Sequence, residues 1–329
     1  EEYMAEPWLP RLLEVEEDDG GGPGSEPEVV GWRVLAFHTR SYGPTERDRI
    51  RGGLERGDPA ELARLHTHLG ELFAEASLAL LAEAGVSPRE VAAAGSHGQT
   101  VWHDPPGELG RGSSLQLGCP ATLAERTGMG VVSDFRSRDL AAGGHGAPLV
   151  PWADRILFSS LDGPRTLQNL GGMGNVTWLP RKGDPGPILA FDTGPGVALL
   201  NEATRVATGG ERSFDRDGRL ARKGAVSAFL LEELLAHPFF REAPPRSTGR
   251  ETFGEAMVRE AADRLGEVRG RDLEPGSPEE GWPDLLATLV ALTAQSIGAS
   301  YREWVIPRGV DEVFLLGGGA RNPALVVGT

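Results

Sequence analysis

The stretch "AFDTGPGVALLNE" (190–202) predicts a strand that runs into a tight turn and then into a helix. Its last strand position is the acid Asp192, and Gly194 and Gly196 follow closely. Proline and glycine end the strand, since proline lacks a ladder N–H and glycine allows tight turns. A carboxylate at the carboxyl end of a strand, beside glycines that open the backbone, indicates a ligand site in an α/β fold.

The composition is typical of a soluble globular protein. A length of 329 residues suggests two domains, and the chain is 39% hydrophobic and 25% charged. No apolar run approaches the roughly 20 residues of a membrane helix, and a single cysteine, Cys119, fits a reducing compartment. The net charge of −15 argues against a nucleic-acid surface. We therefore expect a cytoplasmic protein with neither nucleic-acid nor membrane partners.

Strand and helix patterns alternate along the chain, which predicts an α/β fold. One helix is expected to begin at Asp58 as N-cap and to end at Gly85. Acidic and glycine-rich residues 16–28 predict a mobile loop. The further expected elements are strands at 29–43, 91–96, 187–192 and 312–318, a hairpin at 165–180, and helices from 197 and at 224–236, 253–265 and 284–304.

Four glycine-punctuated segments each follow an expected strand. Ligands of open α/β sheets bind beyond the carboxyl ends of the strands, so the four segments are expected to converge. None matches the phosphate loop that ends in Lys-Ser or Lys-Thr. The segments are "GSHGQTVWHDP" (95–105), "VVSDFRSRDLAAGGHGAPLVP" (131–151), "NLGGMGN" (169–175) and "VFLLGGGARNP" (313–323).

The first two segments are rich in directional polar groups. Hydroxyls, amides and imidazoles in the first suit a hydroxyl-rich ligand, although a polar turn that caps its own backbone remains an alternative. In the second, the planar arginine fork suits a carboxylate or a phosphate, and a surface ion-pair cluster is the alternative. The polar residues are Ser96, His97, Gln99, Thr100 and His103 in the first segment, and Asp134, Arg136, Arg138 and Asp139, before Gly144, in the second.

The last two segments are candidate anion sites. Successive glycines allow backbone N–H groups to point toward one anion. For the third segment, an ordinary hairpin turn is an equally good interpretation. The residues concerned are Asn169, Gly171, Gly172, Gly174 and Asn175 in the third segment, and Gly317, Gly318, Gly319 and Asn322 in the fourth.

Seven motifs, in order, resemble those of the anhydro-N-acetylmuramic acid kinase family, within the sugar kinase, heat-shock protein and actin superfamily. Each motif alone is weak, whereas seven in order are specific. The resemblance runs from about residue 29 to residue 325. The motifs are "GSHGQTVWHDP", "DFRSRDLAAGGHGAPLVP", "NLGGMGNVTWLP", "FDTGPGVALLNE", "SFDRDG" (213–218), "STGRETFG" (247–254) and "LLGGGARNP".

The resemblance implies two ribonuclease-H-like, actin-like ATPase domains that flank a deep cleft with a hinge. Residues 1–125 would hold the sugar-binding loop, and residues 126–329 the catalytic aspartate, the phosphate hairpin and the nucleotide loop. The implied reaction belongs to peptidoglycan recycling. Water opens the 1,6-anhydro ring at C1 while ATP, with Mg²⁺, phosphorylates O6, giving N-acetylmuramic acid 6-phosphate and ADP. Related enzymes are often homodimers, so a homodimer is expected.

The same resemblance assigns roles to residues. Asp192 would be the general base, and the helix from Val197 would aim its positive N-terminus into the site. Sugar contacts are expected from Ser96, His97, Gln99, Thr100, His103, Asp134, Arg136, Asp139 and Gly144. Nucleotide or phosphate contacts are expected from Asn169, Gly171, Gly172, Asn175, Gly194, Gly196, Gly317, Gly318, Gly319 and Asn322.

The chain departs from the family pattern. An N-terminal "MSGTSxDG"-like phosphate loop has no counterpart, and the chain stops at "RNPALVVGT", before a segment with a further carboxylate. We expect the native enzyme to contain both pieces. His145 and Val197 stand where the family has Gln and Asn. A catalytically impaired sugar-binding relative, or a related kinase for another sugar, are the alternative interpretations.

Overall fold

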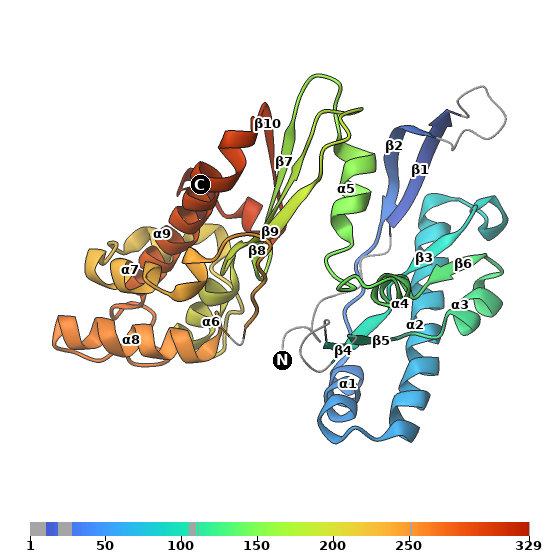
Figure 1. The fold of residues 1–329 in the computed structure, drawn as a ribbon. Coiled ribbons are helices and arrows are strands. Elements are labelled where there is room, and N and C mark those ends of the chain that lie inside the picture. Colours follow the sequence, from blue (N-terminus) through green and yellow to red (C-terminus); the bar gives the residue numbers. More distant parts are fainter. Residues whose placement is uncertain (1–10, 19–27, 105–109, 111, 251, 329) are drawn as a thin grey trace. The chain divides into compact units, whose positions relative to one another are not determined.

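The structure is a computed structural model that describes residues 11–18, 28–104, 110, 112–250 and 252–328 (Figure 1). It is a mixed α/β protein that divides into two compact units, Glu1–Val150 and Pro151–Thr329. Among the described residues, no helix combines the length and apolar character needed to cross a membrane.

The first unit is organised around the long helix α2 (Pro59–Ala84). Asp58 caps its start by accepting a hydrogen bond from the Ala60 amide at 2.9 Å, and Gly85 ends it in the left-handed conformation. Leu65 and Leu69 of this helix are fully buried with Ile50 of α1. The other elements are β1 (Arg11–Asp18), β2 (Glu28–Phe37), α1 (Pro44–Arg56), β3 (Ala94–Ser96), β4 (Gln99–Asp104), β5 (Ser113–Leu117), α3 (Pro120–Thr127), β6 (Val131–Ser133) and α4 (Phe135–Ala141).

Three short strand pairs flank this helix in sequence. β1 and β2 are antiparallel, as are β4 and β5, whereas β3 and β6 are parallel. The register of the parallel pair sets Ser96 opposite Ser133. The two loops that leave these strands therefore begin side by side.

The second unit contains a four-stranded sheet in the order β10-β7-β8-β9. β7, β8 and β9 form an antiparallel meander, and β10 lies parallel to β7. The strands are β7 (Arg165–Leu170), β8 (Gly174–Leu179), β9 (Leu189–Gly194) and β10 (Glu312–Leu316), and the helices are α5 (Val150–Phe158), α6 (Ala198–Ala207), α7 (Ala228–Leu235), α8 (Glu255–Arg269), α9 (Trp282–Ser300) and α10 (Pro323–Gly328).

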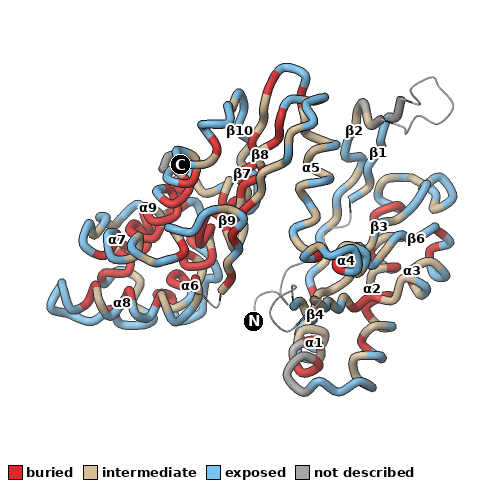
Figure 2. Tube along the Cα trace, viewed as in Figure 1, coloured by how far each residue is buried: buried red, intermediate tan, exposed pale blue. Residues whose placement is uncertain are grey.

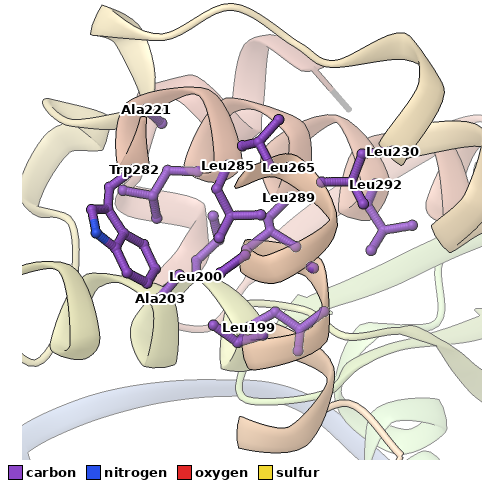
Figure 3. Close-up of a cluster of buried hydrophobic side chains, with 14 of the residues drawn as sticks. Leu199, Leu200, Ala203, Ala221, Leu230, Leu265, Trp282, Leu285, Leu289 and Leu292 are labelled. Carbon is purple, nitrogen blue, oxygen red and sulfur yellow. The ribbon is translucent and has the colours of Figure 1, made fainter. Parts of the chain in front are cut away.

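The core of the second unit gathers on α9, which is buried along most of its length (Figure 2). Leu285, Leu289 and Leu292 of this helix meet Leu199 of α6 and Leu265 of α8 in one apolar cluster (Figure 3). The burial of each such side chain stabilises the fold by about 1.5–3 kcal/mol. This cluster holds α6, α8 and α9 together.

Several expected elements are confirmed, and others differ. The hairpin, the helix from about 197 and the helix capped by Asp58 are present. Of the expected loop 16–28, residues 16–18 and 28 belong to β1 and β2, and the rest lies outside the described residues. The polar loop 95–105 is partly strand β4, in which Val101 turns into the core and the next residue, Trp102, is exposed.

The division of the chain also lies elsewhere than at the expected 125/126 boundary. It falls at 150/151, because β6 pairs with β3 and keeps the residues after 125 in the first unit. Helix α4 was not expected from the sequence, since its seven residues are too few to show helical periodicity.

We expect Leu289→Ala to lower the free energy of unfolding by about 2–5 kcal/mol, because a fully buried side chain would leave a cavity. Leu289 is 1% exposed. Chemical denaturation measures the change. Val268→Ala on α8 is the control, because Val268 is 60% exposed and such surface changes stay within about 0.5 kcal/mol. Equal effects of the two substitutions would contradict the assigned core.

Candidate functional site

Two polar segments of the first unit meet at one hydrogen bond. His97 follows β3, Arg136 lies on α4 after β6, and the Arg136 Nε donates to the His97 Nε2 at 3.0 Å. The parallel pairing of β3 and β6 places both segments at the same end of the strands. The expected convergence of the segments at 95–105 and 131–151 is thus present within the first unit.

The partners of His97 define its protonation state. Arginine Nε can only donate, so the His97 Nε2 must accept and the proton must sit on Nδ1. Nδ1 lies 3.1 Å from the Gly98 carbonyl oxygen, to which it donates. Desolvation of the ring lowers the pKa of His97, the Gly98 contact raises it, and the Arg136 charge lowers it further. Because the pKa is lowered overall, the imidazole stays neutral. A neutral imidazole can both donate a hydrogen bond to a ligand and accept one from it.

His103 belongs to the same cluster. Its Nδ1 lies 3.1 Å from the Ser114 Oγ of β5, and burial, together with the charges of Arg136 and His145, lowers its pKa, although Asp104 raises it. Gln116 also contacts the Ser114 hydroxyl at 2.7 Å. Sequence reasoning missed Ser114 and Gln116. The alternation of β5 could have revealed them, because both share one face of the strand.

The glycine-rich part of the second segment is held by Asp139. Its Oδ2 accepts from the Gly146 amide at 2.7 Å, and a side chain on Gly144 would overlap its carboxylate. Asp134 has a left-handed backbone conformation, with φ of 57°, and its Oδ1 accepts from the Ser137 hydroxyl. Both acids therefore shape the loop through internal hydrogen bonds, and the sugar contacts expected of them stay predictions.

In the second unit, the Asp192 carboxylate is fixed at the end of β9. Its Oδ2 accepts from the Thr248 amide at 2.8 Å. Asp192 and Arg246 also bond through their backbones, because the Asp192 amide donates to the Arg246 carbonyl at 3.1 Å. The carboxylate thus lies near the carboxyl end of β9, which runs two residues past the predicted last position, and the loop 246–250 holds it there.

Arg246 is the buried anchor of that loop. Its guanidinium donates to the carbonyls of Asp192 at 2.9 Å and of Glu242 at 2.7 Å, and to the Ser300 hydroxyl at 2.8 Å. It also lies over the Phe191 and Phe239 rings. Burial lowers its pKa, and Glu242 offsets this in part. Arg246 was not predicted, because no local sequence pattern distinguishes a buried arginine from an exposed one.

The third and fourth glycine segments lie against each other. The parallel pairing of β10 with β7 sets Leu316 opposite Asn169. The Asn169 side chain lies between Gly171 and Gly317, since a Cβ on either glycine would meet it. The expected convergence of these two segments is therefore present within the second unit.

The turn between β7 and β8 is hydrogen-bonded to the first residues of α6. The carbonyls of Gly171 and Gly172 accept from the amides of Val197 at 2.9 Å and Ala198 at 3.0 Å. These two helix donors are thus paired with the protein itself. The predicted orientation of the positive N-terminus of this helix toward a ligand stays a prediction. Val197 offers no capping side chain, and the hairpin carbonyls take that place.

Most of the candidate glycines are explained by packing. A side chain at Gly196 would overlap the carbonyls of Gly171 and Gly172. Gly172 and Gly318 differ, because a Cβ there would find room. The same close packing explains Gly194, against Ser296 and Phe240, and Gly319, against Leu170 and Val197.

The two remaining asparagines also have internal roles. The Asn322 Oδ1 accepts from the Ala324 amide at 3.0 Å and caps α10. Asn175 lies opposite Asp192 in the register of β8 and β9, and its carbonyl accepts from Gln168. In the first unit, the Gln99 amide donates to the Thr100 carbonyl, and Ser96 ends β3.

The described residues contain no group of three or more His, Cys, Asp or Glu side chains that could hold a metal ion. A carboxylate near the carboxyl end of a strand, beside a glycine turn, is nevertheless typical of a ligand site in an α/β fold.

Comparison with known proteins identifies the family. A family model described as anhydro-N-acetylmuramic acid kinase matches residues 47–328. A relative of that name from Caldanaerobacter subterraneus is 44% identical over 275 residues, 82% of this chain and 67% of the relative. Another, from Gloeobacter violaceus, is 45% identical over 304 residues, 92% of this chain and 75% of the relative. This chain belongs to the anhydro-N-acetylmuramic acid kinase family.

Among solved structures, an ROK hexokinase from Thermus thermophilus aligns with 96% of this chain and 88% of its own. The TM-score is 0.31 and the identity 16%, values too low to support an argument.

Acidification is expected to destabilise the first unit. The pKa of His97 is lowered in the folded chain, so the unfolded chain binds that proton more tightly. Stability is therefore lost as the pH falls below about 6.5, the ordinary histidine value. His97→Gln should shrink the difference in unfolding free energy between pH 7 and pH 5, measured by denaturant titration. His38→Gln, beside Glu83, controls for the loss of a histidine, and an equal reduction there would contradict the assignment.

Proposed function

We propose that this chain is an ATP-dependent kinase that opens the ring of 1,6-anhydro-N-acetylmuramic acid and phosphorylates O6. Family membership supports the substrate. The observation that carries the chemistry is the Asp192 carboxylate, held at the end of β9 by the Thr248 amide. The products are N-acetylmuramic acid 6-phosphate and ADP, as in the recycling of peptidoglycan.

Asp192 is the proposed general base. A water oxygen forms a bond to C1 while the C1–O6 bond breaks, and the carboxylate takes the proton of that water. O6 then attacks the γ-phosphorus, whose bond to ADP breaks. The Thr248 amide uses one carboxylate oxygen, which fixes the direction of the group. Positioned acid–base catalysis of this kind contributes about 10²–10⁴-fold.

The phosphate groups are proposed to lie at the adjoining turns of Gly172 and Gly318. Among the described residues, nothing lies closer than 3.7 Å to a Cβ placed on Gly172, and nothing lies within 4 Å of one placed on Gly318. Mg²⁺ would enter as the ATP complex, since it commonly binds through one or two carboxylates and substrate phosphates. The described residues hold no cluster that would bind it alone.

The sugar is proposed to lie at the cluster of His97, His103 and Arg136. These side chains, with Gln116 and Ser114, offer donors and acceptors at one end of β3 and β6. Arg136 and Arg138 are the proposed partners of the lactyl carboxylate.

The wider architecture completes the proposal. A meander with a parallel fourth strand in the second unit supports a ribonuclease-H-like domain. Two such domains around a hinged cleft, a homodimer and a cytoplasmic location are further parts of it.

Incubation with ATP and the anhydro-sugar in ¹⁸O-labelled water tests the reaction. We expect one label at C1 of a phosphorylated product, because water opens the ring. Phosphorylation of an ordinary hexose without label would support a kinase for another sugar. Sugar binding without turnover would support a catalytically impaired relative. Either of these results would contradict the proposed reaction.

Asp192→Asn should reduce kcat by orders of magnitude, in line with the loss of a general base. The amide oxygen can still accept from the Thr248 N–H, so the fold and sugar affinity should persist. Steady-state kinetics and sugar titration measure the two effects, and circular dichroism checks the fold. Asp217→Asn is the control, because Asp217 is an exposed partner of Arg219. Normal turnover of the Asp192 variant would contradict its role as the general base.

A further inference from the structure

The turn between β7 and β8 presents its amides away from α6. The Gly171 and Gly172 carbonyls point to the Val197 and Ala198 amides. In a planar trans peptide, the carbonyl of one residue and the N–H of the next point in opposite directions. The N–H groups of Gly172 and Met173 are therefore directed away from the helix, on the open side of the turn.

The glycine at position 172 is not explained by the protein around it. Its φ lies outside the left-handed region, and among the described residues a Cβ there would meet only the Arg250 Nη2, at 3.7 Å. Packing would thus accept a side chain at this position. A glycine is required if another molecule lies close to the backbone, as at other phosphate-binding turns.

Arg250 borders the same space and lies in a loop whose neighbouring residues are fixed by hydrogen bonds. The Phe253 amide donates to the Gly249 carbonyl at 2.9 Å, and Phe253 is fully buried. Thr248, which holds Asp192, lies in the same loop. One loop therefore orients the carboxylate and brings a guanidinium to the hairpin turn.

We propose that Arg250 binds the phosphoryl group that is transferred from ATP, together with the Gly172 and Met173 amides. This inference rests on the proposed function and adds a catalytic residue to it. The charge on the three equatorial oxygens of the transferring group needs donors in fixed positions. The planar guanidinium supplies two parallel N–H groups, while the amides supply the opposite side. Arg250 donates hydrogen bonds only, and no bond to it forms or breaks.

Two substitutions test this role. Arg250→Gln should lower kcat/KM by about 10³-fold, within the range known for such arginines. It should weaken binding of a non-hydrolysable ATP analogue while leaving ADP binding within about twofold, because only the analogue carries the γ-phosphate. Arg250→Lys should recover little, since a point charge lacks the fork. Arg259→Gln is the matched control, because Arg259 is an exposed partner of Glu255 on α8.

Gly172→Ala offers a test that leaves the arginine in place. The added methyl fits the free protein but fills the space beside the Arg250 guanidinium. We expect the same selective loss of ATP-analogue binding, with unchanged thermal stability. This variant decides the question if the Arg250 variants fail to fold.

The outcomes separate the inference from the proposed function. Equal loss of ADP and analogue binding, or wild-type kinetics in Arg250→Gln or Gly172→Ala, would overturn the role of Arg250. Absence of label at C1 in the wild-type reaction would instead overturn the proposed substrate chemistry. The analogue-to-ADP affinity ratio still tests Arg250 in that case, because it requires no sugar.

Discussion

The arrangement of the second unit depends on the buried guanidinium of Arg246. Burying a cation costs free energy unless each of its N–H groups finds a hydrogen-bond acceptor. Here backbone carbonyls and a hydroxyl accept hydrogen bonds from the guanidinium. Those acceptors come from β9, from the segment before the loop and from the end of α9. The single side chain thus joins three parts of the unit, and the position of the Asp192 carboxylate follows from it.

In the turn between β7 and β8, the hydrogen bonds of the carbonyl groups set the direction of the amide groups. The first amides of α6 are paired with the Gly171 and Gly172 carbonyls, so the helix end offers these two donors to no ligand. The same bonds turn the neighbouring amides outward. We propose that the hairpin, beside Arg250, binds the anion that was expected at the helix. Packing, more than ligand access, explains the glycines at 194, 196 and 319.

In the first unit, the short parallel strands β3 and β6 bring two polar loops together. His97 and Arg136 are 39 residues apart in sequence, and only the pairing of β3 with β6 makes them neighbours. The guanidinium and the desolvation of the ring both keep His97 neutral. A neutral imidazole can donate at one nitrogen and accept at the other, which suits a ligand rich in hydroxyl groups.

The sequence by itself determined the α/β class, the hairpin, the capped helix after Asp58, the place of Asp192 near the carboxyl end of a strand, and the family. Local patterns carry these features, because caps, turns and periodicity act over a few residues. The tertiary structure decided which candidates have internal roles, such as Asp139 and Asn322, and which residues were missed, such as Arg246 and Ser114. The boundary at 150/151 likewise came from the pairing of β6 with β3. Contacts between residues far apart in the chain leave no local pattern, so only the folded chain reveals them.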